Sequence, residues 1–171
     1  MTISKPITTL RAIAFAWLIL ILGACQRPLT TLEKIDRLKK QVETDVTALQ
    51  RIEEQDYPKL SKTFMQCDSL LQFMDAQQVE QHFQTLNLTN AYLQQFETLR
   101  SEMHDKLDYS RLQIGYLHDD VSTHKLSDSL ALAYLNTETQ VADTLHHRIA
   151  YFRDRFAQCQ KELAQLKKAR R

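Results

Sequence analysis

Histidine and carboxylate side chains that could bind a metal ion occur in the second half of the chain. Four of them would lie on facing helices if two neighbouring helices form a hairpin: His104, Asp108, Asp143 and His146. Imidazole and carboxylate groups can together bind zinc or iron, and helical bundles build such sites between their helices. A di-iron bundle, however, uses two Glu-x-x-His sequences, whereas this chain has only Asp143-x-x-His146. The alternative is that these four side chains are solvated beside the core.

Two cysteines, Cys67 and Cys159, could form a disulfide bond. Each lies on an apolar stripe of a predicted helix, and both approach the same end of the fold if the first and third helices run parallel. Such a pair can bond in an oxidising compartment when the two stripes face each other. The alternative is a pair of buried thiols that act as small apolar residues. The sequence has no Cys-x-x-Cys motif, which argues against a thiol-redox enzyme.

The composition excludes several classes of function. The 171 residues include only 2 glycines, whereas phosphate-binding loops, nucleophile elbows and dinucleotide-binding turns need several. The formal net charge is +1, so no basic excess attracts nucleic acid. We also find no nucleophile with a base and an orienting group at recognisable spacing. We therefore expect no enzymatic activity, no cofactor and no nucleic-acid partner.

The first long segment with helical periodicity follows residue 30. Thr30 and Glu33 have the spacing of a capping box, and apolar residues then recur every three or four positions. Pro58 removes a backbone donor and disfavours helix at the residue before it. We expect a kink or short break near residues 56–59, with helix on both sides.

Two further helical segments follow. Asp75 can cap a short helix that ends in a corner at residues 87–89, and the second long segment then runs from Tyr92 to Val121. Residues 122–125 are expected to form a turn, and Ser127 or Asp128 caps the third segment. The predicted core positions of these two segments include Met103, Leu130, Tyr134, Val141 and Phe152.

These segments predict an all-α fold. Each apolar stripe is too large to remain exposed to water. We expect an elongated up-down-up three-helix bundle with coiled-coil-like packing and a short connecting helix, because this fold buries all three stripes. An intermolecular coiled coil is the competing arrangement. The short turn between the second and third segments favours an antiparallel hairpin within one chain, and it places His104 opposite Leu145 or His146.

The beginning of the chain has the pattern of a bacterial leader sequence. Lys5 and Arg11 precede an apolar run at residues 12–22, which is too short for a bilayer core that needs about 20 residues. The next residues complete Leu22-Gly23-Ala24-Cys25, which resembles the lipobox of bacterial lipoproteins. The resemblance implies cleavage before Cys25 and lipidation of its sulfur. A short membrane anchor or a buried helix is the alternative.

The residue after Cys25 bears on location. It is Gln26 and not Asp, which by resemblance to enterobacterial lipoproteins implies sorting to the outer membrane. The following residues also lack the acidic run that resembles a surface-export signal in Bacteroidota. We therefore expect a chain that faces the periplasm and is held at the outer membrane by its N-terminal lipid.

Three tripeptides resemble the acceptor sequence of bacterial O-glycosylation, in which Asp precedes Ser or Thr and an apolar residue follows. Their hydroxyl residues are Ser69, Ser129 and Thr144. Since Asp-Ser is also a common pair at helix starts, a purely structural role is the alternative.

These inferences give a predicted organisation and function. Residues 1–24 form the signal peptide, residues 25–30 a tether and residues 31–171 the helical bundle. We expect a non-enzymatic binding, adaptor or spacer protein whose partner is an envelope protein or the cell wall. The alternative is a small-ligand or metal-binding lipoprotein that uses the histidine and carboxylate residues of the hairpin.

Overall fold

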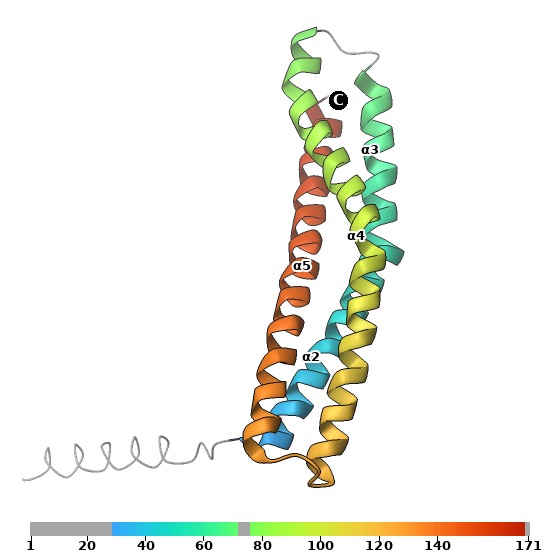
Figure 1. Ribbon diagram of the computed structural model, residues 1–171. Helices are drawn as coiled ribbons and strands as arrows, with labels where there is room; N and C mark the ends of the chain where they lie inside the picture. The colour runs from blue at the N-terminus through green and yellow to red at the C-terminus, as the bar shows by residue number, and fades with distance from the viewer. Residues whose placement is uncertain (1–28, 72–75, 170–171) are drawn as a thin grey trace, which may run out of the picture. The chain divides into compact units, whose positions relative to one another are not determined.

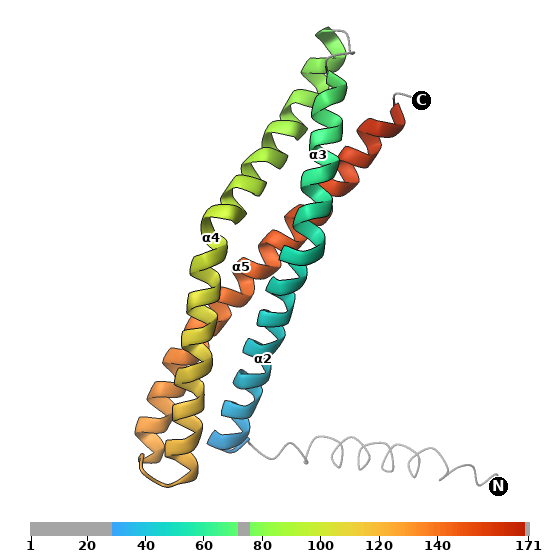
Figure 2. The same cartoon turned by 90° about the vertical axis from the view of Figure 1, so that its right-hand side faces the viewer.

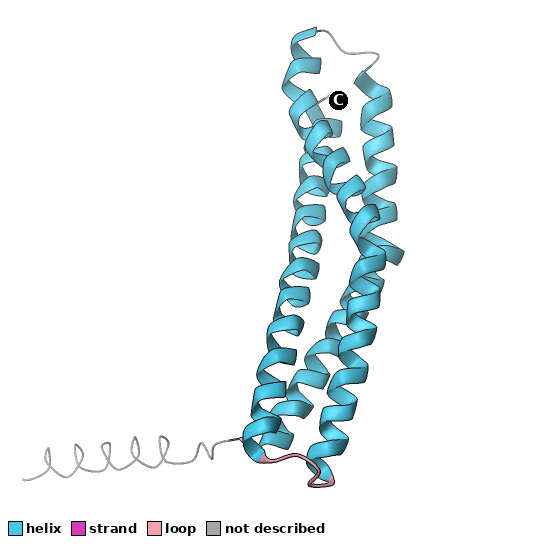
Figure 3. Ribbon diagram, in the orientation of Figure 1, coloured by secondary structure: helices cyan, strands magenta, loops and turns pink. Residues whose placement is uncertain are grey.

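The computed structural model describes residues 29–71 and 76–169, and every regular element in this part of the chain is a helix (Figure 3). The elements are α2 (Thr31–Arg51), the π-helix η1 (Ile52–Asp56), α3 (Tyr57–Leu71), α4 (Ala76–Ser122) and α5 (Asp128–Ala169). The chain divides into two compact units, residues 1–30 and residues 31–171. The second unit contains all five elements and is described below.

The helices of this unit form a bundle of three legs. The first leg consists of α2, η1 and α3, the second is α4 and the third is α5, and each leg packs against the other two (Figures 1 and 2). The turn after α4 lies at the same end as the start of α2, so the first and third legs run parallel and α4 runs antiparallel to both. The predicted all-α, up-down-up three-helix bundle is confirmed.

The first leg passes Pro58 without a break. The backbone N–H of Tyr57 donates to the carbonyl oxygen of Ile52, which closes one wider π turn directly before the proline. This turn makes room for a ring that has no N–H and would clash with the preceding turn of a regular helix. On the neighbouring leg, the Gln160 amide donates to the backbone oxygen of Asp56 at 3.3 Å. The interruption predicted near residues 56–59 is therefore a π-bulge with helix on both sides.

The second leg corrects one expectation. Within the described residues no separate short helix precedes it, because α4 is one continuous helix of 47 residues from Ala76 to Ser122. Asp75, the predicted cap, lies outside the described residues. The expected corner at residues 87–89 lies inside this helix. Thr89 is fully buried there, and its hydroxyl donates to the Thr85 backbone oxygen at 2.8 Å. A polar side chain that bonds to its own helix can occupy a core position, so the polar residues did not mark a corner.

The turn between α4 and α5 ends the helix with a Schellman motif. The N–H of Lys125 donates to the Asp120 oxygen at 2.9 Å, and the N–H of His124 donates to the Val121 oxygen at 3.2 Å. His124 has a φ of 55°, which is the left-handed conformation that this motif requires. Helix α5 begins at Asp128, and the Ser127 carbonyl accepts its first helical hydrogen bond, from Ala131 at 2.9 Å. The predicted turn is confirmed.

The core of the bundle follows a heptad pattern on α5. Its buried residues follow steps of three and four along the helix, as in a coiled coil, apart from one step of seven between Leu135 and Ala142: Ala131, Leu135, Ala142, Leu145, Ile149, Phe152, Phe156, Cys159 and Leu163. Met103 and Phe152 are buried, as predicted. Leu130, Tyr134 and Val141 were expected in this core but are exposed, because small Ala131 and Ala142 face the other helices instead.

Candidate functional site

His104 lies beside the first leg of the bundle. Its Nε2 atom is 2.9 Å from both carboxylate oxygens of Glu53 in η1. This contact joins α4 to the π-bulge, whereas the sequence analysis placed His104 opposite Leu145 or His146 on α5. Glu102, two residues earlier, accepts a hydrogen bond from Arg148 of α5 at 3.1 Å. The register of the hairpin is therefore the expected one, but Glu102 and not His104 makes the contact between α4 and α5.

The other candidate ligands each have a separate partner. The Nδ1 atom of His146 is 2.8 Å from Asp45 Oδ1, and Asp143 Oδ1 accepts a hydrogen bond from Gln41 at 3.0 Å. Asp108 is paired with Arg111 on its own helix at 3.6 Å. His104, Asp108, Asp143 and His146 are therefore not brought together, which corrects the expectation that they could share one site. The described residues contain no group of three or more His, Cys, Asp or Glu side chains arranged to hold a metal ion.

Asp45 is a buried carboxylate that was not among the predicted site residues. Only 3% of this residue is exposed, and it stands on the core stripe of α2 between Val42 and Leu49. Its Oδ1 contacts His146, while Oδ2 is buried and has no hydrogen-bond partner within the described part of the chain. The sequence pattern could have predicted this burial, because Val42 and Leu49 are seven residues apart and Asp45 occupies the core heptad position between them.

A second missed carboxylate, Glu138, fills the corresponding gap on α5 between Leu135 and Ala142. Its Oε2 atom is buried, and none of the residues that the structure describes donates a hydrogen bond to it. Burial raises the pKa of the Glu138 carboxyl above its ordinary value. The side chain as a whole is half-buried, but a buried carboxylate oxygen without a hydrogen-bond partner is unfavourable for folding and needs an explanation.

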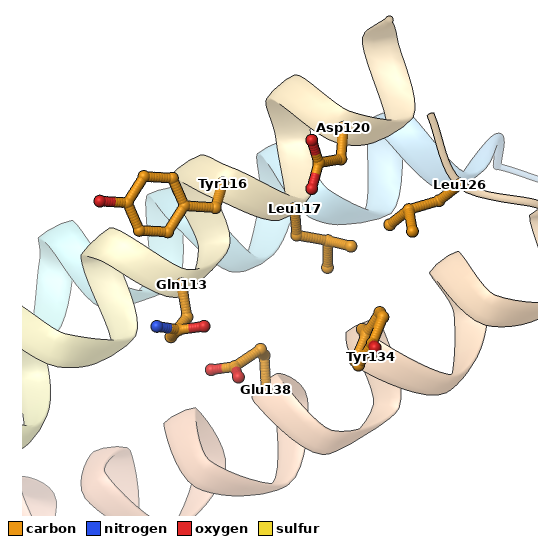
Figure 4. Close-up of a pocket in the computed structure, with 7 residues that line it drawn as sticks. All are labelled: Gln113, Tyr116, Leu117, Asp120, Leu126, Tyr134 and Glu138. Atoms are coloured by element: carbon orange, nitrogen blue, oxygen red, sulfur yellow. The ribbon is translucent and has the colours of Figure 1, made fainter. Parts of the chain in front are cut away.

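Glu138 lines a cavity of about 320 Å³ between α4 and α5, close to the turn (Figure 4). The lining residues come from both helices and from the turn: Gln113, Tyr116, Leu117, Asp120, Leu126, Tyr134 and Glu138. Asp120 already has a cation nearby, since Lys125 Nζ is 3.5 Å from it. The cavity therefore combines two tyrosine rings, two leucines and the Glu138 carboxylate, whose Oε2 has no hydrogen-bond partner in the described part of the chain.

Large apolar side chains are exposed on both helices that form this cavity. They form what we call the α4–α5 surface: Tyr109, Leu112 and Tyr116 on α4, and Leu130, Tyr134 and Val141 on α5. Within each helix the spacing of three, four or seven residues places these side chains on one face. Tyr116 and Tyr134 are 61% and 51% exposed and both line the cavity, so each row has one ring at the cavity. Apolar patches of this kind are typical of binding surfaces.

The two cysteines are buried free thiols. The Cys67 sulfur donates to the backbone oxygen of Leu163 at 3.7 Å, and Leu163 follows Cys159 by one helical turn. The first and third legs are thus parallel neighbours, as predicted, but the considered disulfide is not formed because Cys67 faces the backbone one turn beyond Cys159. Burial raises the pKa of both thiols; Lys167 opposes this at Cys67, and a hydrogen bond from Thr89 opposes it at Cys159.

The remaining predicted sites divide between exposed positions and residues that the structure does not describe. Ser69, Ser129 and Thr144 are exposed on helices. The Ser69 and Thr144 hydroxyls donate to backbone oxygens of their own helices, at 3.0 and 2.8 Å, and Ser129 lies 3.3 Å from Ser127. Cys25, the predicted lipidation site, lies outside the described residues. Among the described helices, none has both the length and the apolar character needed to cross a membrane.

Comparisons of the chain with protein-family models, with curated proteins and with solved structures found no match.

Proposed function

We propose that this protein is a lipid-anchored, non-enzymatic helical bundle of the bacterial cell envelope that binds a protein partner through its α4–α5 surface. The observation that carries the proposal is the set of six large apolar side chains exposed on this surface. Three come from each helix of the hairpin, and one of each three, Tyr116 and Tyr134, lines the cavity beside Glu138. Burial of such side chains against a partner would contribute favourable free energy of binding.

The anchor is inferred from the sequence. Leu22-Gly23-Ala24-Cys25 resembles a lipobox, and Gln26 favours the outer membrane facing the periplasm. A lipid on Cys25 would confine the bundle to the membrane surface, and attached acyl chains contribute about 0.8 kcal/mol per buried methylene group. The adaptor role thus combines a fixed attachment at one end of the chain with a binding surface on the hairpin.

The metal- or ligand-binding alternative has less support for the residues first considered. His104 and His146 each contact the first leg of the bundle, and Asp143 and Asp108 have partners of their own. These contacts account for the four side chains without a ligand.

Attachment is tested by replacing Cys25 with Ser and fractionating the cells. We expect the wild-type protein in the membrane fraction and the variant released from it, because the serine hydroxyl cannot form the thioether that holds the lipid. Equal retention of both proteins in the membrane would contradict the lipoprotein assignment.

Partner binding is tested by photo-crosslinking in cells. A photoreactive amino acid at Tyr116 or Tyr134 should crosslink to one protein of defined mass, whereas the same group at exposed Lys39 on α2 should not. Crosslinks of equal yield from all three positions, or none from Tyr116 and Tyr134, would contradict the proposed binding surface.

A further inference from the structure

The Glu138 side chain is half-buried and stands at a heptad position of α5. Its Oε2 atom is buried and accepts no hydrogen bond from the described residues. An apolar residue at this position would avoid the unfavourable burial of a carboxylate. The carboxylate is therefore explained best by a cationic group that enters from outside and pairs with it.

A second site between the same two helices shows how the chain itself places a cation beside tyrosines. The Arg155 guanidinium lies 5.7 Å from the ring centre of Tyr92 on α4 and 5.3 Å from that of Tyr151 on α5. Tyr116 and Tyr134 also line the cavity, one from each helix, although their rings are not in contact with each other as those of Tyr92 and Tyr151 are (Figure 4). Here the carboxylate of Glu138 is present in addition.

We propose that the cavity binds the guanidinium group of an arginine side chain carried by the protein partner. This inference rests on the proposed function and names the chemistry by which the α4–α5 surface recognises its partner. Glu138 would accept hydrogen bonds from the guanidinium, and Tyr116 and Tyr134 would contact its planar face. An entering arginine would thereby satisfy the buried oxygen.

The other residues of the cavity suit the rest of an arginine side chain. Leu117 and Leu126 provide apolar walls for its methylene groups, and the Gln113 amide oxygen can accept a further N–H. Guanidinium is planar, weakly hydrated and able to bond two acceptors at once, whereas a lysine ammonium is a strongly hydrated point charge. A cavity that combines aromatic rings with the buried Glu138 oxygen therefore favours arginine over lysine.

The inference is tested by titrating the purified, isotope-labelled full-length protein in detergent micelles with a blocked Ala-Arg-Ala peptide and following its amide resonances. We expect saturable shifts confined to residues 113–120, 126 and 134–138. The same peptide with citrulline in place of arginine keeps the shape but loses the charge, and it should bind at least tenfold more weakly. Equal binding of the two peptides would overturn the proposal, and equal binding of a lysine peptide would overturn the choice of arginine.

Substitutions test whether the arginine peptide binds at the cavity. Glu138→Gln keeps the side-chain shape and should weaken arginine-peptide binding at least tenfold, and Tyr134→Leu should weaken it less. Glu54→Gln, an exposed carboxylate on the π-helix, is the matched control and should bind as wild type. Circular dichroism verifies that each variant is folded. Wild-type affinity in Glu138→Gln would overturn the proposal.

The pH dependence provides an independent readout. Burial raises the pKa of Glu138, and only the ionised carboxylate pairs with guanidinium. Binding should weaken as the pH falls through this raised pKa in the wild type, and the Glu138→Gln variant should lack this step.

The crosslinking experiment separates failure of this inference from failure of the proposed function. Unchanged crosslinking from Tyr116 in a Glu138→Gln background would keep the protein partner and overturn the arginine contact. Binding of the arginine peptide without any crosslinked partner in cells would support the arginine site and contradict the adaptor function.

Discussion

Two sections of the bundle are built in opposite ways. The aromatic section, made by Tyr57, Phe96, Phe152 and Phe156, joins all three legs through ring contacts with centroids 5.2–6.2 Å apart. The polar section lies closer to the α4–α5 turn. Its core positions hold polar or small residues: Asp45 on α2, Ser110 on α4, and Glu138 and Ala142 on α5.

Contacts between the legs place the residues of the polar section near one another. Arg111, next to Ser110, donates to Glu43 at 2.9 Å, and Glu43 is two residues before Asp45. His146, one turn beyond Ala142, contacts Asp45. The three buried side-chain atoms without hydrogen-bond partners in the described residues all belong to this section: Asp45 Oδ2, Ser110 Oγ and Glu138 Oε2.

In this fold, one section contributes most to stability and the other contains the proposed binding site. Close-packed rings contribute burial and aromatic contacts, whereas unpartnered polar atoms lower stability. Residues that weaken a fold are expected at functional sites, and the proposed arginine site lies in the polar section. We therefore expect substitutions in the aromatic section to destabilise the bundle, and some substitutions in the polar section to stabilise it.

The largest effect is expected from Phe152→Ala in the aromatic section. Phe152 is 1% exposed and contacts Phe96 and Phe156, so its removal leaves a cavity that should cost about 3–5 kcal/mol of unfolding free energy. Denaturant unfolding followed by circular dichroism measures this loss. Tyr134→Ala on the exposed α4–α5 surface is the control and should change stability by less than about 0.5 kcal/mol. Similar losses in both variants would remove the distinction between core and surface.

The next effect concerns the one hydrogen bond that the Asp45 carboxyl group receives from α5. His146→Ala should cost about 1–3 kcal/mol, because it leaves a buried carboxyl group without its partner. His147→Ala, at the adjacent exposed position, is the matched control. A combined Asp45→Leu and His146→Ala variant should regain the lost stability, since it removes both polar partners. Failure of the double variant to recover would show that the pair stabilises the bundle by itself.

A stabilising effect is expected from Glu138→Leu at pH 7, by about 1 kcal/mol. Burial raises the folded-state pKa of Glu138, so its contribution to stability is fully present below the unfolded pKa and is lost as the pH rises through the folded value. The advantage of leucine should therefore shrink as the pH is lowered toward about 4. Unfolding curves at both pH values measure it, and Glu54→Leu should show no comparable gain. A destabilised Glu138→Leu protein at pH 7 would contradict the account of this carboxylate.

The smallest effect is expected from Gly115→Ala in α4. Nothing lies within 4 Å of a β-carbon built at this position, so alanine should raise the unfolding free energy by about 0.8 kcal/mol through helix propensity alone. Thermal unfolding detects a change of this size. The reverse substitution at an exposed α5 position, Ala133→Gly, should lower stability by a similar amount. A loss of stability in Gly115→Ala would mean that the open space at this position has a role in the fold.

The helical fold could be predicted from local patterns, because each pattern has a direct physical cause. Apolar residues at steps of three and four must be buried on one face of a helix, and the short connection at residues 122–125 requires an antiparallel hairpin. The parallel arrangement of the first and third legs follows from this order. Local patterns were insufficient at residues 87–89, where polar side chains lie within a continuous helix because Thr89 bonds to its own backbone.

The site could not be predicted in the same way. The sequence indicated which histidines and carboxylates lie on the hairpin, but the rotation of each helix decided that His104 and His146 face the first leg. The same rotation exposes Tyr134 and buries Ala131, although an apolar stripe could be drawn through either. Asp45 and Glu138 were visible as gaps in the heptad pattern, yet only packing against the other legs could show that their oxygens lack partners.

The sequence by itself therefore determined the helices, their order and the turn that pairs α4 with α5, because these depend on periodicity and connection length. Only the tertiary structure decided which of two neighbouring stripes enters the core, which polar atoms remain without partners and where the cavity lies. These features depend on how three helices share one interior: a small residue lets a neighbouring helix approach and turns the adjacent large side chains toward solvent. Tyr134 and Glu138 acquire their places from that packing, and so does the binding site that we propose.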